Sequence, residues 1–478
     1  MARLPRVPKL RRPEGPAWLP TLNPFAWTMR AAASFHPGSM PRMTRGNYRR
    51  EMAAAIFLPW VIAAVEGGVA GVIVKKYFTG EVARGPVDLG VAVVTAAPAF
   101  ANIMSFLFVR LAHGRHKIRS IALLQIGVAL MAGAMALAPR TAAGLWIVVG
   151  ATVLARVCLA GVITLRATVW RANYPREARA RLTGRISAAQ TLVVAVGGAA
   201  IGAAMDANEE SFRWVVPGAS LLSLAGVWAW SRVRVRRHRA LLDAERASPP
   251  DEAPTFNPLR VLGVLKKDRL FAWYMAFQFT MGFANLMCFS ILVIMIDERF
   301  ELAYTPSMLI THGIRYGMIA LTVPLWALLL DRMHVARYRA IHTWVFAAMT
   351  LAFFIAGTGR FEWLLYIAAV IHGLAFAGGS LAWNIGHNDF ADDANASRYM
   401  AAHVTLTGMR GLVAPFAGVL IYRGLETRFG PGAGSWTFAI ASAMCAAGAL
   451  GFAWLASVIR RERSAAPGPN IGPNTGGP

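Results

Sequence analysis

Charged residues, acidic residues and cysteines are all scarce in this chain of 478 residues. Charged residues make up 15% of the sequence, whereas a soluble domain carries about 25%, so an ordinary water-soluble protein is excluded. The three cysteines have no metal-binding or redox spacing, and we expect small buried side chains and no metal site. The sequence has no phosphate-binding loop (GxxxxGK[ST]), no dinucleotide-binding GxGxxG on a strand–helix unit and no nucleophile elbow (GxSxG). These absences argue against an ATP-driven pump, a nucleotide cofactor and an enzyme.

Long apolar runs, in contrast, are abundant. Twelve stretches each approach the length of roughly 20 residues that a helix needs to cross a bilayer. They predict an all-α membrane protein with twelve transmembrane helices in two groups of six, separated by the polar stretch 232–268. The predicted spans are 52–74, 89–112, 120–138, 144–169, 186–205, 214–231, 270–296, 306–330, 340–358, 362–385, 400–422 and 434–458.

The placement of the positive charge sets the topology and argues against nucleic acid as a partner. Lysine and arginine concentrate in the N-terminal tail, the central polar stretch and alternate loops, and are sparse in the other loops. By the positive-inside rule the basic segments and both termini lie in the cytoplasm, next to anionic lipid headgroups. We therefore expect a multi-pass protein of the inner or plasma membrane.

This plan divides the chain into five parts. They are a cytoplasmic tail rich in proline and arginine (1–48), a six-helix bundle (49–231), a cytoplasmic linker (232–268), a second six-helix bundle (269–460) and a disordered cytoplasmic tail (461–478). The two halves show weak internal similarity; for example, Thr191 aligns with Thr407 and Gly202 with Gly418 at one shift. Parallel halves of this kind are typical of one large class of secondary transporters.

The 6+6 plan with its basic central loop resembles the major facilitator superfamily over residues 50–460. Asp331-Arg332, with Arg337 and Arg339, matches part of the family's loop motif after the second span of the second half. In the first half, Gly114-Arg115-His116-Lys117 keeps the basic end of that motif and lacks its acid. The resemblance implies two pseudo-symmetric bundles, with spans 1, 4, 7 and 10 around a central cavity, spans 2, 5, 8 and 11 between the halves, and spans 3, 6, 9 and 12 facing lipid.

Glu66 is the only acid deep inside any predicted span. A charge at the bilayer centre costs about 2.5–3.5 kcal/mol on insertion scales, so such a group faces water, forms an ion pair or stays protonated. We interpret Glu66 as a proton-coupling residue, with a structural ion pair to an arginine as the alternative. Arg156, Arg315 and Arg410 lie near the middle of spans 4, 8 and 11, which leaves an excess of positive charge that an anionic substrate could complete.

The three arginines are expected to have different roles, depending on whether their span lines the cavity or lies between the halves. Arg156, on a cavity-lining span, is predicted to bind substrate, whereas Arg315 and Arg410 are predicted to form a charge network at the interface between the halves. Polar side chains on spans 7 and 10 are further candidates for substrate binding: Gln278, Asn285, His372, Trp383 and Asn384. Packing is the alternative for His372 and Trp383.

Charged cytoplasmic loops are predicted to form a gate. Asp389 and Asp392 follow span 10, and the equivalent loop of the first half carries Arg171, so opposite charges could pair when the cytoplasmic side closes. Asp331, Arg332, Arg337 and Arg115 are assigned to the same gating loops; solvated charge is the alternative.

Together these features predict a secondary transporter that works by alternating access, coupled to protons through Glu66 and moving a small organic anion. The sequence leaves two alternatives open. One is an exporter of amphipathic drugs or hydrophobic compounds, which predicts an apolar cavity with the arginines facing away. The other is a non-transporting sensor or assembly factor of the same fold, which predicts a collapsed cavity and Glu66 locked in an ion pair. The oligomeric state is not determined by these patterns.

Overall fold

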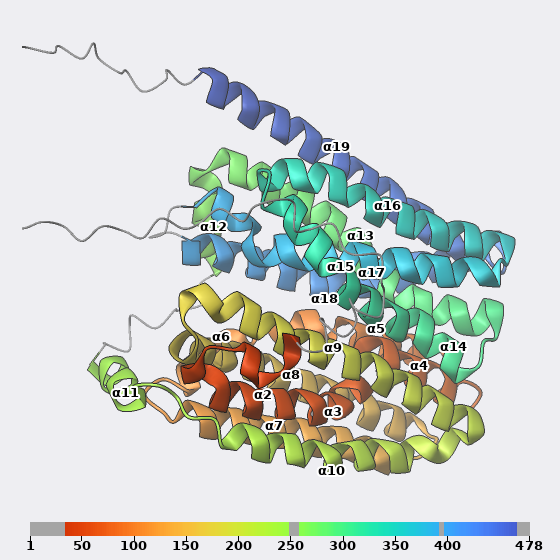
Figure 1. Cartoon of the computed structure of the whole chain (residues 1–478). Helices are drawn as coiled ribbons and strands as arrows, with labels where there is room; N and C mark the ends of the chain where they lie inside the picture. The colour runs from red at the N-terminus through yellow and green to blue at the C-terminus, as the bar shows by residue number, and fades with distance from the viewer. Residues whose placement is uncertain (1–33, 248–257, 392–395, 466–478) are drawn as a thin grey trace, which may run out of the picture.

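A computed structural model describes residues 34–247, 258–391 and 396–465, and these are almost entirely helical (Figure 1). Within these ranges twelve helical segments are long and apolar enough to cross a membrane, which confirms the predicted all-α membrane fold with twelve spans. Most of the predicted tails 1–48 and 461–478 lie outside the described residues.

The first half contains six spans. Its first span comprises α2 (Arg45–Phe57), α3 (Pro59–Ala64) and α4 (Gly67–Phe78). The next five comprise α5 (Arg84–Ile103) with the short α6 (Ser105–Leu111) after it, α7 (Lys117–Ala134), α8 (Ala142–Asn173), α9 (Arg176–Ala207) and α10 (Phe212–Ser231). Helices α11 (His238–Ala247) and α12 (Pro258–Lys267) belong to the linker.

The second half repeats this plan. Its spans are α13 (Arg269–Phe300), the pair α14 (Tyr304–Met308) and α15 (Ile314–Leu330) joined by a π-helical turn at Leu309–Gly313, α16 (Val335–Gly359), α17 (Glu362–Ile385), α18 (Ala396–Phe429) and α19 (Trp436–Ala465). Short 3₁₀ turns occur at Pro37–Ser39, Arg42–Thr44, Met135–Leu137, Glu209–Ser211, Gly386–Asp389 and Ala433–Ser435.

The first span is broken twice, and the second break positions a functional residue. Helix α3 begins at Pro59, a residue that starts helices readily but cannot donate a backbone hydrogen bond inside one. Glu66 then has extended backbone angles, φ −73° and ψ 136°, between α3 and α4. Gly68 follows, and a Cβ there would lie 2.9 Å from the Thr311 carbonyl oxygen in the π-helical turn. Glycine therefore lets the broken span approach the eighth span closely.

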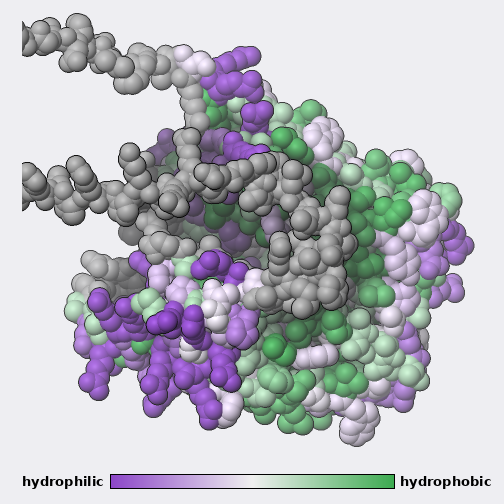
Figure 2. Space-filling model, in the orientation of Figure 1, coloured by the Kyte–Doolittle hydropathy of each residue, from purple (hydrophilic) through white to green (hydrophobic). Residues whose placement is uncertain are grey.

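The two halves lie side by side as two helical groups (Figure 1). Across their interface α5 packs against α18, and α9 packs against α14 and α15, so spans 2, 5, 8 and 11 join the halves as the resemblance implied. We call the end that carries α11 and α12 the linker end, and the end that carries the turns 79–83 and 430–432 the far end. Figure 2 shows a broad hydrophobic surface between more hydrophilic side chains at the two ends, which matches the demands of a bilayer.

The spans are longer than hydropathy predicted. The first extends over 42–78 rather than 52–74, and the second begins at Arg84 rather than at residue 89. These extensions bring Glu51 and Asp88 into helices, where they are 1% and 3% exposed. Hydropathy missed these two buried acids, because other helices supply partners for charges at the span ends.

Candidate functional site

Glu66 lies at the break in the first span and is bound from both halves of the molecule. Arg156 on α8 places Nη1 2.7 Å from Glu66 Oε2, and Arg315 on α15 places Nη2 3.3 Å from Oε1. Glu66 and Arg315 are 6% and 3% exposed. The three residues that the sequence assigned to separate roles therefore form one ion-paired group, which we call the Glu66 cluster.

Arg315 is held by aromatic rings as well as by Glu66. Its guanidinium carbon lies 4.5 Å from the ring centre of Phe289, 4.8 Å from that of Tyr316 and 5.3 Å from that of Phe376. Cation–π contacts of this kind stabilise a desolvated arginine. The cluster contains two guanidinium groups and a single carboxylate, so it carries excess positive charge when all three are ionised.

The π-helical turn of the eighth span supports the cluster. It directs His312 toward the first half, where Nε2 lies 2.9 Å from the carbonyl oxygen of Val194 on α9. Gly198 makes room for this ring, because a Cβ there would lie 2.4 Å from His312 Cδ2. π-Helical turns occur frequently at functional sites. No local sequence pattern marks His312 as functional.

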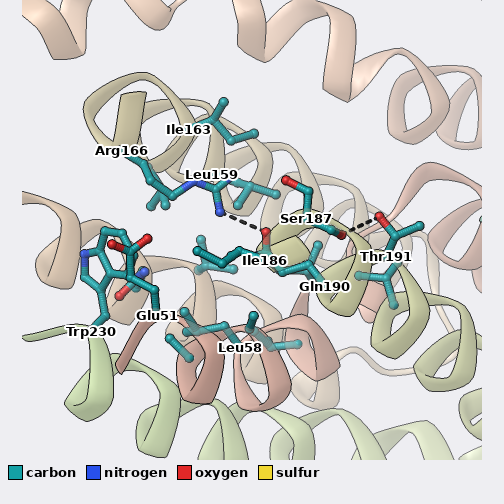
Figure 3. Close-up of a pocket in the computed structure, with 18 of the residues that line it drawn as sticks. Glu51, Leu58, Leu159, Ile163, Arg166, Ile186, Ser187, Gln190, Thr191 and Trp230 are labelled. Carbon is teal, nitrogen blue, oxygen red and sulfur yellow. Dashed lines mark hydrogen bonds between the residues drawn. The ribbon is translucent and has the colours of Figure 1, made fainter. Parts of the chain in front are cut away.

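A first cavity of about 300 Å³ opens beside the cluster, mainly within the first half. Glu66, Arg156 and Tyr316 contribute to its lining. Figure 3 shows Arg166 directed across the cavity to Gln190, and the guanidinium donates to the Gln190 amide oxygen at 2.9 Å. We call this space the first-half cavity.

Glu51 is a second acid on the wall of this cavity (Figure 3). Its carboxylate accepts hydrogen bonds from the Tyr174 hydroxyl at 2.7 Å and from the Trp170 indole. The described hydrogen bonds to Glu51 therefore come from neutral donors, whereas Glu66 is bound by cations from both halves.

A second cavity of about 290 Å³ lies in the second half against α5. Four residues predicted from the sequence to bind substrate or to form the interface network line it together: Gln278, Asn285, Trp383 and Arg410. Phe346 and Phe376 add aromatic surface. No carboxylate occurs among the described residues that line this second-half cavity.

Two arginines give the second-half cavity its charge. Arg410 Nη1 donates to the Gln278 carbonyl oxygen at 2.6 Å, and Nη2 lies 3.3 Å from Thr407 Oγ1. Arg339, which the sequence placed in a loop motif, lies inside α16 and is 1% exposed. Its Nη2 lies 3.3 Å from the Gly379 carbonyl oxygen and its Nη1 lies 3.4 Å from His342 Nδ1. No carboxylate therefore occurs among the described hydrogen-bond partners of either guanidinium group.

Two buried amides in this cavity lack partners. Within the described structure the Gln278 Oε1 and Asn285 Oδ1 atoms have no hydrogen-bond partner. Trp383, in contrast, donates its indole N–H to Thr407 Oγ1 at 3.1 Å. Buried polar atoms are normally satisfied, so the two unpartnered amide oxygens mark positions where a hydrogen-bond donor of a ligand could bind.

The other two predicted substrate-binding residues lie elsewhere. His372 is buried among Phe289, Phe353 and Phe376, and it is not part of the described lining of either cavity. Asn384 is exposed, and its amide donates to the Ser380 carbonyl oxygen of its own helix at 2.7 Å. Geometry therefore places both residues away from the two cavities, because one-dimensional spacing does not specify which face of α17 meets the cavity.

The predicted gating residues do not pair across the halves in this conformation. Asp389 accepts the backbone N–H of Val335 at 2.6 Å, which caps α16 within its own half. Arg171 is exposed, as are Asp331, Arg332, Arg337 and Arg115. Asp392 lies outside the described residues. The gate stays a prediction for a state in which the linker end is closed.

The far end is instead joined by a network of ion pairs that the sequence analysis missed. Lys75 Nζ lies 2.9 Å from Asp88 Oδ1 and 2.5 Å from Glu298 Oε1. Arg423 Nη2 lies 2.6 Å from Asp88 Oδ2 and 2.6 Å from Glu298 Oε1. The network is completed by Arg84 with Glu298 and Glu426, Arg423 with Glu426, and Lys76 with Asp297. Apart from Arg315–Glu66, every ion pair between the halves in the described structure belongs to this network.

This far-end network indicates the state of the molecule. α4 and α5 of the first half are joined by ion pairs to α13 and α18 of the second. No comparable ion pair joins the halves at the linker end among the described residues. The conformation is therefore closed by charge pairing at the far end only.

Metal-binding geometry is absent from the described residues, where no three His, Cys, Asp or Glu side chains are placed to hold an ion. Cys158, Cys288 and Cys445 are unpaired.

Comparison with known proteins agrees with this architecture. The sequence profile of the Major Facilitator Superfamily matches residues 51–415. Among solved structures, a D-xylose-proton symporter aligns with 13% identity and a TM-score of 0.66 over 85% of this chain and 96% of its own. A POT family transporter in complex with 5-aminolevulinic acid aligns with 12% identity and a TM-score of 0.65 over 89% and 99%.

The nucleoside transporter NupG also shares the fold, with 13% identity and a TM-score of 0.61 over 86% of this chain and 99% of its own. No curated protein sequence matches the chain. The family profile spans more than half of the sequence, and the chain belongs to the Major Facilitator Superfamily of membrane transporters.

Proposed function

We propose that this protein is a secondary active transporter that couples the movement of a small organic anion to protons by alternating access. The observation that carries the proposal is the Glu66 cluster, in which one carboxylate at the break of the first span is shared by Arg156 and Arg315 from opposite halves. A single protonation event at such a position changes the contact between the halves.

The coupling follows from charge balance. Ionised Glu66 neutralises part of the charge on the two arginines and joins the halves. Protonated Glu66 loses both ion pairs, and its two arginines then lack a counter-ion, which an anionic substrate supplies. Proton and anion thus favour the same state, as symport requires.

The second-half cavity supports the choice of an anion, and it adjoins the Glu66 cluster. Phe376 lines the cavity, and its ring centre lies 5.3 Å from the Arg315 guanidinium carbon. Arg339 and Arg410 reach this space without a carboxylate beside them, and their planar groups suit a carboxylate ligand. Its aromatic wall and the unpartnered amide oxygens of Gln278 and Asn285 favour a small solute with an apolar body and at least one hydrogen-bond donor.

The two alternatives lead to different expectations. An exporter of hydrophobic compounds was predicted to have arginines that face away from an apolar cavity, whereas here Arg156 lines the first-half cavity and Arg410 lines the second-half cavity. A non-transporting scaffold was predicted to have a collapsed cavity, whereas two cavities of about 300 and 290 Å³ are present. The paired state of Glu66 is the feature that such a scaffold would share.

The basic linker end also supports the proposed orientation. By the positive-inside rule this end and both termini lie in the cytoplasm of a cell with this protein in its inner or plasma membrane. The conformation would then be closed toward the outside.

The test is uptake by purified protein in proteoliposomes. With an alkaline interior, we expect labelled organic carboxylates to enter faster than their uncharged amides, and collapse of the pH gradient should remove the difference. Protein-free vesicles measure passive entry of the weak acids. Equal uptake with and without a gradient would contradict proton coupling, and preference for the amides would contradict an anionic substrate.

Arg410→Gln should separate anion binding from folding. We expect the affinity for the transported carboxylate to fall by about 10- to 100-fold, since a hydrogen bond to a charged group contributes about 1.5–3 kcal/mol. The unfolding temperature should not fall, because the substitution removes a buried charge that lacks a counter-ion.

The matched control is Arg428→Gln, which removes an exposed arginine from the far end of the same helix. Isothermal titration calorimetry and thermal unfolding in detergent measure the two effects. Unchanged carboxylate affinity in the Arg410 variant would rule out this arginine as a ligand.

A further inference from the structure

A basic depression at the linker end of the first half has no role in the transport cycle proposed above. It has a volume of about 630 Å³, and Arg50, Arg232 and Arg234 line it together with His116 and His238. No carboxylate is present among its described lining residues. Figure 2 shows the hydrophilic surface to which this region belongs.

The segment that carries two of these arginines is held in place. Asn47 binds the backbone of Arg234 in both directions, with its amide donating to the carbonyl oxygen at 2.8 Å and its oxygen accepting the N–H at 3.1 Å. The next contact joins the Arg236 N–H to Asn173 Oδ1 at 2.9 Å. The arginine side chains therefore extend from an ordered backbone and not from a free loop.

Helix α11 is fixed on the other side of the depression. Glu245 accepts hydrogen bonds from Lys117 Nζ at 2.7 Å and from the Gly114 N–H at 2.8 Å. The linker thus places an acid against the first-half loop motif. Because Glu245 is paired with Lys117, it does not neutralise the arginines of the depression.

Two histidines lie against each other in the depression. Their ring centres lie 4.3 Å apart, and His238 Nε2 is buried with no hydrogen-bond partner in the described structure. Burial, His238 and Arg119 lower the pKa of His116, as expected where positive charge accumulates. His238 also begins α11, so the positive end of the helix dipole faces this region.

The position of the depression relative to the bilayer identifies its ligand. Leu221, Leu224 and Trp228 are 70%, 41% and 58% exposed on α10, and their spacing places them on one face of the helix. This apolar stripe leads to Arg232, whose guanidinium carbon lies 3.5 Å from the Trp228 ring centre. Tryptophan is enriched at the level of lipid headgroups, so the arginines lie at headgroup depth with acyl-chain surface directly below.

We propose that this depression binds the phosphodiester headgroup of an anionic phospholipid from the leaflet at the linker end. Arg50, Arg232 and Arg234 contact the phosphate, and the acyl chains lie along the exposed stripe of α10. The stripe is the reason for a lipid rather than free phosphate, which would gain nothing from it.

The test compares two double variants with equal loss of charge. Arg232→Gln/Arg234→Gln changes the depression, whereas the control Arg236→Gln/Arg239→Gln removes two exposed arginines of the same segment that do not line it. Native mass spectrometry of the full chain with added phosphatidylglycerol or phosphatidylcholine counts bound lipid. We expect the first variant to lose roughly 30-fold in affinity for phosphatidylglycerol, from the contribution of two arginines near a membrane surface, and the control to stay within about 3-fold.

Each other outcome would overturn the proposal. Equal loss in both variants would show diffuse attraction without a defined site. Equal retention of phosphatidylglycerol and phosphatidylcholine would exclude recognition of the anionic headgroup. Displacement of phosphatidylglycerol by millimolar inorganic phosphate would identify a site for the free anion.

Discussion

Glu66→Gln should abolish the effect of a pH gradient on transport while leaving exchange intact. A gradient of one pH unit is worth about 1.4 kcal/mol for each proton carried, so electroneutral symport by the wild-type protein supports about tenfold accumulation of a poorly permeant monoanion. We expect no accumulation by the variant above that in protein-free vesicles. Exchange of labelled for unlabelled anion at equal pH should continue.

The reason lies in the contacts of the carboxylate. Glutamine resembles the protonated acid, which cannot ion-pair with Arg156 or Arg315. Both arginines are then free for the anion at every pH, and the halves can move without a proton. Initial rates of uptake and counterflow in proteoliposomes measure the two activities separately.

Glu51→Gln is the matched control, because Glu51 is a buried acid on the wall of the same cavity. Its partners are the neutral donors of Tyr174 and Trp170, so the gradient effect should persist in this variant. Persistence in the Glu66 variant and loss in the Glu51 variant would reassign the proton site. Loss of exchange as well as accumulation in the Glu66 variant would indicate a structural ion pair.

Apolar patterning was sufficient for the number and order of the spans, because lipid imposes the same demand on every membrane helix. The same rule isolated Glu66, Arg156 and Arg315 as unusual. Apolar patterning could not show that these three residues contact one another. Their contact depends on the break in the first span at Glu66 and on the close approach of the eighth span that Gly68 permits.

Charges at the ends of spans were harder to place. Hydropathy ended the predicted spans before Lys75 and Glu298, and began one after Arg339. In the folded protein these residues lie in helices and contact other helices rather than water. A rule based on the cost of charge in lipid therefore shortens helices wherever a tertiary partner is present.

Disrupting the far-end network should produce the other large effect, a shift of the protein toward the state that is open at the far end. Glu298 contacts three cations, Lys75, Arg84 and Arg423. Glu298→Gln removes its charge, and the loss of a largely buried charged partner costs about 2 kcal/mol, which corresponds to roughly a 30-fold change in the ratio of the two states.

A cysteine reporter at Val293 can measure this opening. Val293 on α13 is 1% exposed and lies between the Glu66 cluster and the far end. Its side chain packs against Gly71 of α4, where an added Cβ would lie 3.4 Å from Val293 Cγ2. In Val293→Cys protein, a membrane-impermeant maleimide should react roughly 30-fold faster when Glu298→Gln is present. The parent chain without the reporter gives the background from its three native cysteines.

Glu301→Gln provides the control, since Glu301 is an exposed acid at the same end that forms no ion pair in the described structure. It should leave the labelling rate unchanged. Equal acceleration in both variants would mean that surface charge alters reagent access, and no acceleration with Glu298→Gln would mean that packing alone closes the far end. Because the network joins α4 and α5 to α13 and α18, a specific effect of Glu298 would show that these ion pairs stabilise the closed arrangement of the two halves.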